Sequence, residues 1–190
     1  MLLSMEEHHA HDYDFLCKIL LVGPFHTGKS ALRERFCDDS FNEKYIDDKL
    51  RYLNEYRTKK VQMCDKTIKF LLWVVQPNTR NNPFSGTHGI LLVYDVTNII
   101  SFRRIKEHLH EVNRYGCENS YKILVGNCCD QERRRVDYNT AKAFAEENAL
   151  KFIETSAKTG LNVEECFAEV AYEVFASRLE KLKACEQSQQ

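Results

Sequence analysis

The sequence predicts an α/β fold, a mostly parallel six-stranded sheet with helices on both faces. Apolar runs of strand length alternate with segments whose apolar residues recur at helical spacing, as in parallel sheets that are covered by helices. The chain has 190 residues, 43% of them hydrophobic, which is enough for one well-packed domain. Ligands of such folds bind at the carboxyl ends of the strands.

The first predicted strand is the apolar run at residues 15–22, and a glycine-rich loop separates it from a helix at 31–36. The runs at 57–63 and 67–75 flank a turn at 64–66, which predicts a β-hairpin. Three further strands are predicted from buried-type apolar runs, at 89–94, 121–125 and 151–154.

Three more helices are predicted between and after these strands. The first is indicated by helical spacing of Phe102, Ile105, Leu109 and Val112. The second covers residues 140–148, and the last carries Val163, Phe167, Val170 and Val174 on one face. Asn162 and Glu165 have the spacing of a capping box at the start of this last helix.

One domain is expected over residues 12–180, between a flexible tail at 1–11 and a polar tail at 181–190. The net charge of −1 gives no electrostatic reason to expect nucleic-acid binding. The eight cysteines have no zinc-site spacing, and unpaired thiols suit a reducing cytoplasm. No signal peptide or transmembrane run is found. Cys185 lies too far from the last residue for a prenylation box, so no direct membrane anchor is expected.

The loop after the first strand has the phosphate-binding pattern of two glycines, Gly23 and Gly28, followed by Lys29 and Ser30. Its backbone N–H groups and the following helix N-terminus attract phosphate. Lys29 is expected to contact the terminal phosphates, and the Ser30 hydroxyl to bind Mg²⁺. The predicted phosphate site comprises Gly23, His26, Thr27, Gly28, Lys29, Ser30 and Ala31.

Two further segments, residues 127–130 and 154–158, follow strand ends. With the loop at 23–30, Trp73 and the run at 93–97, they make the chain similar to the Ras superfamily of small GTPases, and closest to the Rab branch, over residues 12–178. The resemblance implies a P-loop NTPase G domain that binds GTP or GDP with Mg²⁺ and protein effectors or regulators. It also implies vesicle traffic or signalling, in the cytoplasm or on endomembranes reached through a partner.

The resemblance implies that the Asp130 carboxylate accepts hydrogen bonds from guanine, a pair of donors that adenine lacks. Asn127 would join the base loop to the phosphate loop, and the Ala157 N–H would meet the guanine oxygen, with Ser156 and Lys158 holding that loop. Phe41 falls where the family keeps an aromatic against the base, although ordinary packing also explains a phenylalanine there.

The family pattern breaks at several positions. Cys128 replaces the lysine of the Asn-Lys-x-Asp motif, which should weaken nucleotide binding without changing the choice of base. After Trp73, Val74 replaces the carboxylate that anchors the magnesium shell. Pro77 replaces a glycine whose N–H contacts the γ-phosphate, and Asn78 stands in place of the glutamine that orients water.

The first switch also departs from the family. Asp48 takes the place of its threonine and could bind Mg²⁺, but its charge would repel a γ-phosphate. Phe25 is bulky where the family has small residues. His26 beside it is read as a neutral loop contact, with a replacement catalytic base as the alternative.

The sequence therefore predicts a guanine-nucleotide-binding protein with weak hydrolysis and little discrimination between GTP and GDP. Three alternatives stay open: a pseudo-GTPase scaffold without a nucleotide cycle, an ordinary cycling GTPase that uses Asp48 or Gln76, and a nucleoside kinase.

Overall fold

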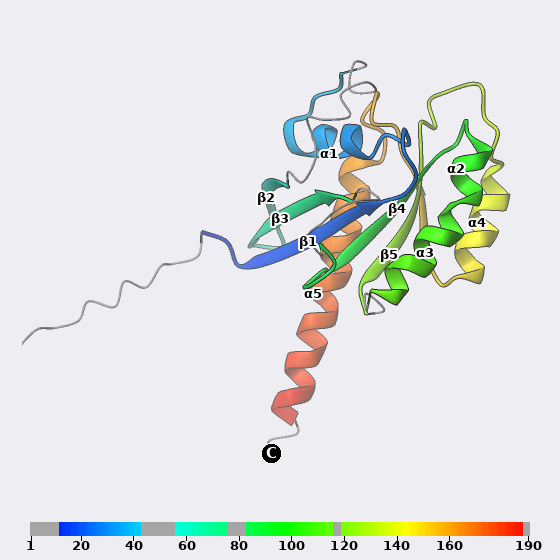
Figure 1. Cartoon of the computed structure of the whole chain (residues 1–190). Helices are drawn as coiled ribbons and strands as arrows, with labels where there is room; N and C mark the ends of the chain where they lie inside the picture. The colour runs from blue at the N-terminus through cyan, green and yellow to red at the C-terminus, as the bar shows by residue number, and fades with distance from the viewer. Residues whose placement is uncertain (1–11, 43–55, 76–82, 116–118, 188–190) are drawn as a thin grey trace, which may run out of the picture.

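The computed structural model describes residues 12–42, 56–75, 83–115 and 119–187. Six strands form one sheet in the order β2-β3-β1-β4-β5-β6 (Figure 1). They are β1 (Phe15–Val22), β2 (Arg57–Met63), β3 (Lys66–Val74), β4 (Gly89–Asp95), β5 (Tyr121–Asn127) and β6 (Lys151–Glu154). Only the β2–β3 hairpin is antiparallel, and the other four neighbouring pairs are parallel. The predicted mostly parallel six-stranded sheet is confirmed.

Helices cover both faces of this sheet. They are α1 (Lys29–Asp38), α2 (Ile99–Arg103), α3 (Ile105–Arg114), α4 (Tyr138–Glu147) and α5 (Val163–Gln187). Helices α1 and α5 pack on one face, and α3 and α4 pack with α2 on the other (Figure 1). Successive residues of a strand point to opposite faces, so Ile19 and Leu21 enter the first core cluster and Leu20 and Val22 enter the second.

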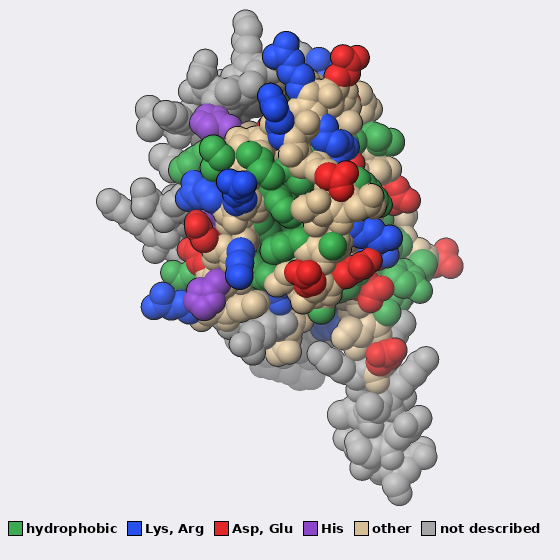
Figure 2. All heavy atoms as spheres, turned by 90° about the vertical axis from the view of Figure 1, so that its right-hand side faces the viewer, with side chains coloured by type: hydrophobic (Ala, Val, Ile, Leu, Met, Phe, Trp, Pro, Cys, Tyr) green, Lys and Arg blue, Asp and Glu red, His purple; other side chains and the backbone are tan. Residues whose placement is uncertain are grey.

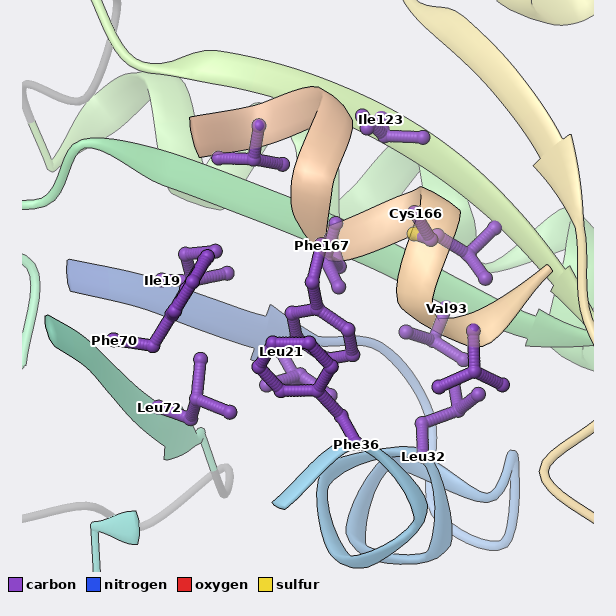
Figure 3. Packing of buried hydrophobic residues seen from close by; sticks show 14 of the residues in the cluster. Ile19, Leu21, Leu32, Phe36, Phe70, Leu72, Val93, Ile123, Cys166 and Phe167 are labelled. Carbon is purple, nitrogen blue, oxygen red and sulfur yellow. The ribbon is translucent and has the colours of Figure 1, made fainter. Parts of the chain in front are cut away.

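The core on the α1 and α5 side is built around stacked aromatic rings (Figure 3). Phe36 of α1 stacks on Phe167 of α5 with ring centroids 4.2 Å apart, and it meets Phe70 of β3 edge to face at 5.1 Å. These contacts fix α1 against the sheet. Because α1 begins at the phosphate loop, the same packing positions that loop.

Two local predictions differ from the structure. The helical spacing from Phe102 to Val112 covers two helices that are separated at Arg104, and the spacing misses the break because Arg104 keeps helical backbone angles. The capping box at Asn162 is wrong, since Asn162 has a left-handed φ of 56° and its side-chain amide donates to the Glu154 carbonyl at 2.8 Å. A capping residue is extended and accepts through its side chain.

The last helix continues through the expected domain boundary. α5 runs without interruption from Val163 to Gln187, so its backbone stays helical past residue 180, and the division between domain and tail remains a prediction. In Figure 1 its C-terminal turns project beyond the sheet. Within the described ranges, the helices are all too short or too polar to cross a lipid bilayer.

Candidate nucleotide site

The phosphate loop joins β1 to α1 at the carboxyl edge of the sheet. The Lys29 ammonium lies inside the loop, where it donates to the carbonyls of Gly23 at 2.9 Å and Pro24 at 2.5 Å. The Thr27 hydroxyl also donates to the Pro24 carbonyl, at 3.1 Å. Gly28 sits before α1 with a left-handed φ of 82°. A Cβ at Gly28 would stand 2.2 Å from the Asn127 amide nitrogen, so only glycine fits this turn.

Lys29 is a buried cation at the start of α1. Its side chain is 6% exposed, and burial lowers its pKa from 10.5 to about 8. Burial disfavours the charged form, and the two carbonyl hydrogen bonds offset only part of that cost. An ammonium held in this way is suited to an arriving anion, because a phosphate would supply the missing negative charge.

Replacing Lys29 with methionine should stabilise the empty protein at pH 7 by up to about 3 kcal/mol, since a lowered lysine pKa is a cost of folding. The unfolded chain binds the extra proton between pH 8 and pH 10.5, so the contribution of Lys29 to stability should rise with pH across that window, against the opposite effect of the buried thiols whose pKa values are raised. Urea unfolding at several pH values measures both effects. We expect the stability difference between the wild type and Lys29→Met to narrow as pH rises across that window, and the difference between the wild type and Lys142→Met to stay constant. A Lys29→Met difference that does not narrow would contradict the assignment.

Asn127 joins the phosphate loop to the loop after β6. Its amide group donates to the Thr27 carbonyl at 3.0 Å. Its carbonyl oxygen accepts from the Ala157 N–H at 3.2 Å and from the Thr155 hydroxyl at 3.3 Å. Asn127 is 1% exposed, so each polar atom of this amide has a partner in a dry environment. The tie that the resemblance implied between the two loops is present.

Arg35 is a residue of the site that the sequence did not identify. From α1 its guanidinium donates to the carbonyls of Ala157 and Lys158, both at 2.8 Å. The fully buried Ser156 hydroxyl accepts a hydrogen bond from the Thr159 N–H at 3.0 Å, and this bond stabilises the turn in the same loop. The contact to Ala157 spans 122 residues of sequence, and no local pattern marks an arginine that reaches so far.

The loop after β5 places Asp130 at the surface, where its carboxylate accepts from the Gln131 amide at 3.0 Å. Cys128 before it has a left-handed φ of 66°. Burial, with smaller contributions from Asp95 and Asp130, raises the Cys128 pKa to about 12. The thiol is therefore protonated at neutral pH and cannot replace a lysine ammonium.

The remaining predicted residues lie in the phosphate loop, at the start of α1 or just after its end. His26, exposed with a left-handed φ of 60°, and Phe25, 56% exposed, form its outer side. Ser30 is half-buried at the start of α1. Ala31 and Phe41 both pack against the α1–α5 core cluster, so the contact of Phe41 with a base stays a prediction.

Of the residues expected at the magnesium site, one described residue offers an oxygen ligand. Ser30 supplies a hydroxyl, whereas Val74 ends β3 with an apolar side chain that is 7% exposed. No group of three acidic, histidine or cysteine residues that could hold a metal occurs in the described ranges. Asp48, Pro77 and Asn78 lie outside those ranges. The described residues thus fit phosphate and a base loop better than a complete magnesium shell.

Comparison with known proteins agrees with this geometry. The model of the Ras family matches residues 18–176. The chain belongs to the Ras family. It is 39% identical over 169 residues to Ras-related protein Rab-1A of Dictyostelium discoideum, a match that covers 86% of this chain and 82% of that protein. It is 43% identical over 162 residues to Ras-related protein RABD2a of Arabidopsis thaliana, which covers 82% of this chain and 78% of that protein.

Ras-related protein RIC1 of Oryza sativa subsp. japonica is 42% identical over 169 residues, with 86% of this chain and 82% of that protein covered. The chain is therefore a small GTPase of the Ras superfamily, in its Rab branch. The resemblance drawn from the phosphate and base loops is confirmed at the level of family and fold.

Proposed function

We propose that this Rab-like small GTPase binds guanine nucleotide, hydrolyses GTP weakly and holds GTP and GDP with nearly equal affinity. It would act in vesicle traffic or signalling through protein effectors or regulators, as the resemblance to Rab proteins implies. Asp130 would select guanine, and the Ala157 N–H, which donates to Asn127 in this structure, would turn to the guanine oxygen when the base binds. Lys29 and the N–H groups of the phosphate loop would hold the phosphates.

The observation that carries the proposal is Val74. This side chain ends β3 beside the phosphate loop, and its neighbour Val75 donates its N–H to the Leu21 carbonyl at 2.9 Å. Val74 offers no oxygen to a magnesium shell, which is one of the parts that phosphoryl transfer needs. Switching between two protein conformations also needs a protein contact that forms only with the triphosphate. A nucleotide that binds both conformations with equal affinity does not shift the equilibrium between them.

The test is to identify and compare the bound nucleotides. Nucleotide released from denatured protein should chromatograph as GDP or GTP. Competition binding should give affinities for GDP and a non-hydrolysable GTP analogue within about fivefold of each other, with little effect of EDTA. Single-turnover hydrolysis should be slow with or without Mg²⁺. A GTP analogue that binds more than about tenfold tighter than GDP only with Mg²⁺ would refute the proposal.

Val74→Asp sharpens this test, because it restores a carboxylate at the end of β3. We expect its nucleotide affinity to become sensitive to EDTA. Val75→Asp is the matched control, since it adds the same charge one residue later, just past the end of β3 and toward the other face of the sheet, where Val75 packs with the second core cluster. It should leave the response to EDTA as in the wild type.

A scaffold without a nucleotide cycle is a second candidate, favoured by the large exposed Phe25 on the phosphate loop and by Cys128 in the base loop. A thermal shift separates the two, because a ligand stabilises the folded state by RT ln(1 + [L]/Kd). A melting temperature that rises with millimolar GDP supports nucleotide binding, and one that does not move supports the scaffold.

A further inference from the structure

A basic surface with an apolar centre lies on α2 and on the segment that precedes α4. It consists of Ile100, Arg103, Arg104, Arg133 and Arg135, and we name it the arginine patch. All five residues are exposed. Ile100 is 65% exposed, the highest fraction of any large apolar side chain in the described part of the chain.

Helical spacing places three of these residues together. Ile100, Arg103 and Arg104 stand at positions i, i+3 and i+4, which share one face of a helix. The opposite face of α2 points into the protein, where Ser101 is 2% exposed and Ile99 and Phe102 pack against the second core cluster. The exposure of Ile100 therefore follows from the fold of α2, which keeps its other apolar residues inside.

The segment that precedes α4 runs beside the start of α2. The backbone N–H groups of Arg135 and Val136 both donate to the Val96 carbonyl, at 2.9 and 3.0 Å. Arg134 turns to β6, where it makes a bidentate ion pair with Glu154 at 2.6 and 2.8 Å. Its neighbours Arg133 and Arg135 are exposed to solvent.

Little of the positive charge of the patch is neutralised. Arg104 approaches Glu107 at 3.5 Å, and both side chains are more than half exposed, so this ion pair is weak. Among the described residues, Arg103, Arg133 and Arg135 have no ion pair within 4.0 Å. Figure 2, which faces the α2–α3–α4 side, shows several Lys and Arg side chains in its upper part, with apolar and acidic side chains nearby.

We propose that the arginine patch is a docking site for an acidic protein segment that carries an apolar side chain. Arginine and a central apolar anchor are typical of residues that dominate binding at protein interfaces. Carboxylates pair with guanidinium groups in bidentate geometry, and Ile100 would be buried beneath the apolar side chain of the partner.

Charge favours a peptide over an anionic membrane. Glu107, Glu132 and Asp137 are exposed close to the patch in sequence, and Figure 2 shows acidic side chains spread across the same face. A flat bilayer would approach these carboxylates together with the arginines. A short acidic segment can contact the arginines alone.

The site does not depend on the proposed nucleotide function. The patch is formed by α2 and the segment before α4, outside the loops that would contact a γ-phosphate. Its affinity for a partner should therefore be the same with GDP, with a GTP analogue, or without nucleotide.

Fluorescence anisotropy of the full chain tests the proposal with a short labelled peptide of glutamates around a central pair of leucines. We expect saturable binding, weakened about tenfold or more by Arg103→Glu combined with Arg133→Glu, and severalfold by Ile100→Ser. The control is Arg114→Glu combined with Lys142→Glu, which changes the net charge equally at exposed positions outside the patch. It should bind nearly as well as the wild type.

Three results would overturn the proposal. The first is the absence of saturable peptide binding, and the second is an equal loss in the control double variant, which would indicate net charge alone. The third is patch-dependent sedimentation with phosphatidylserine vesicles that exceeds binding to the peptide, which would assign the surface to membranes. Circular dichroism confirms that each variant is folded.

Discussion

Replacing Glu34 with leucine should lower the free energy of unfolding by about 3–5 kcal/mol, because it leaves a buried cation without its carboxylate. Glu34 is 1% exposed and Arg33 is fully buried, and both lie on α1. The Arg33 guanidinium donates to one Glu34 oxygen at 2.7 and 3.1 Å. Arg57 of β2 approaches the other oxygen at 3.2 Å, so this carboxylate joins the helix to the hairpin.

Urea unfolding measures the loss of unfolding free energy in Glu34→Leu, and two further variants serve as comparisons. The double variant Arg33→Leu with Glu34→Leu removes both buried charges, and it should be much more stable than Glu34→Leu alone. Glu146→Gln breaks an exposed pair with Lys142 at 4.0 Å and should cost less than about 0.5 kcal/mol. A cost below about 1 kcal/mol for Glu34→Leu would mean that the Arg33 charge does not depend on this partner.

Replacing Asp130 with asparagine should weaken GDP binding by about 100-fold or more. A guanine ring presents an N–H and an amino group side by side, and a carboxylate accepts from both, whereas an amide turns one acceptor into a donor. A donor facing a donor leaves both without partners in the bound state, at a cost of a few kcal/mol.

Calorimetry with GDP and with ADP measures this change. The variant should lose its preference for GDP while the already weak binding of ADP stays the same. Glu132→Gln is the matched control, because it removes an equal charge from an exposed position two residues later. Equal GDP affinity in Asp130→Asn and the wild type would remove Asp130 from the base site.

Most of the fold could be predicted because its signals are local. Strand β6 at Lys151–Glu154 has the predicted bounds, and the β2–β3 hairpin differs by one residue at each end of β3. Apolar runs and turn residues lie within a few positions of the structure they specify. The errors arise where local patterns mislead. At Asn162 a left-handed turn replaces the cap, and at Arg104 a short break leaves the helical spacing intact.

In the candidate site, too, the residues found from the sequence are those with local patterns, and the residue that was missed depends on long-range contacts. The glycines, Lys29 and Asp130 were identified because their residue types and spacing carry the chemistry. Arg35 was not, because its partners on the loop after β6 are more than a hundred residues away in the sequence. The arginine patch also needs the structure, which brings the segment before α4 beside α2.

The amino-acid order alone determined the α/β architecture, the phosphate loop and the family, since each depends on residue types at short and regular spacing. Only the tertiary structure decided that Arg33 and Glu34 are buried together, that Asn127 contacts Thr27 across 100 residues, and that Lys29 is dry enough for a lowered pKa. Burial and long-range contacts depend on how distant segments pack, and a single sequence does not encode that packing in any local pattern.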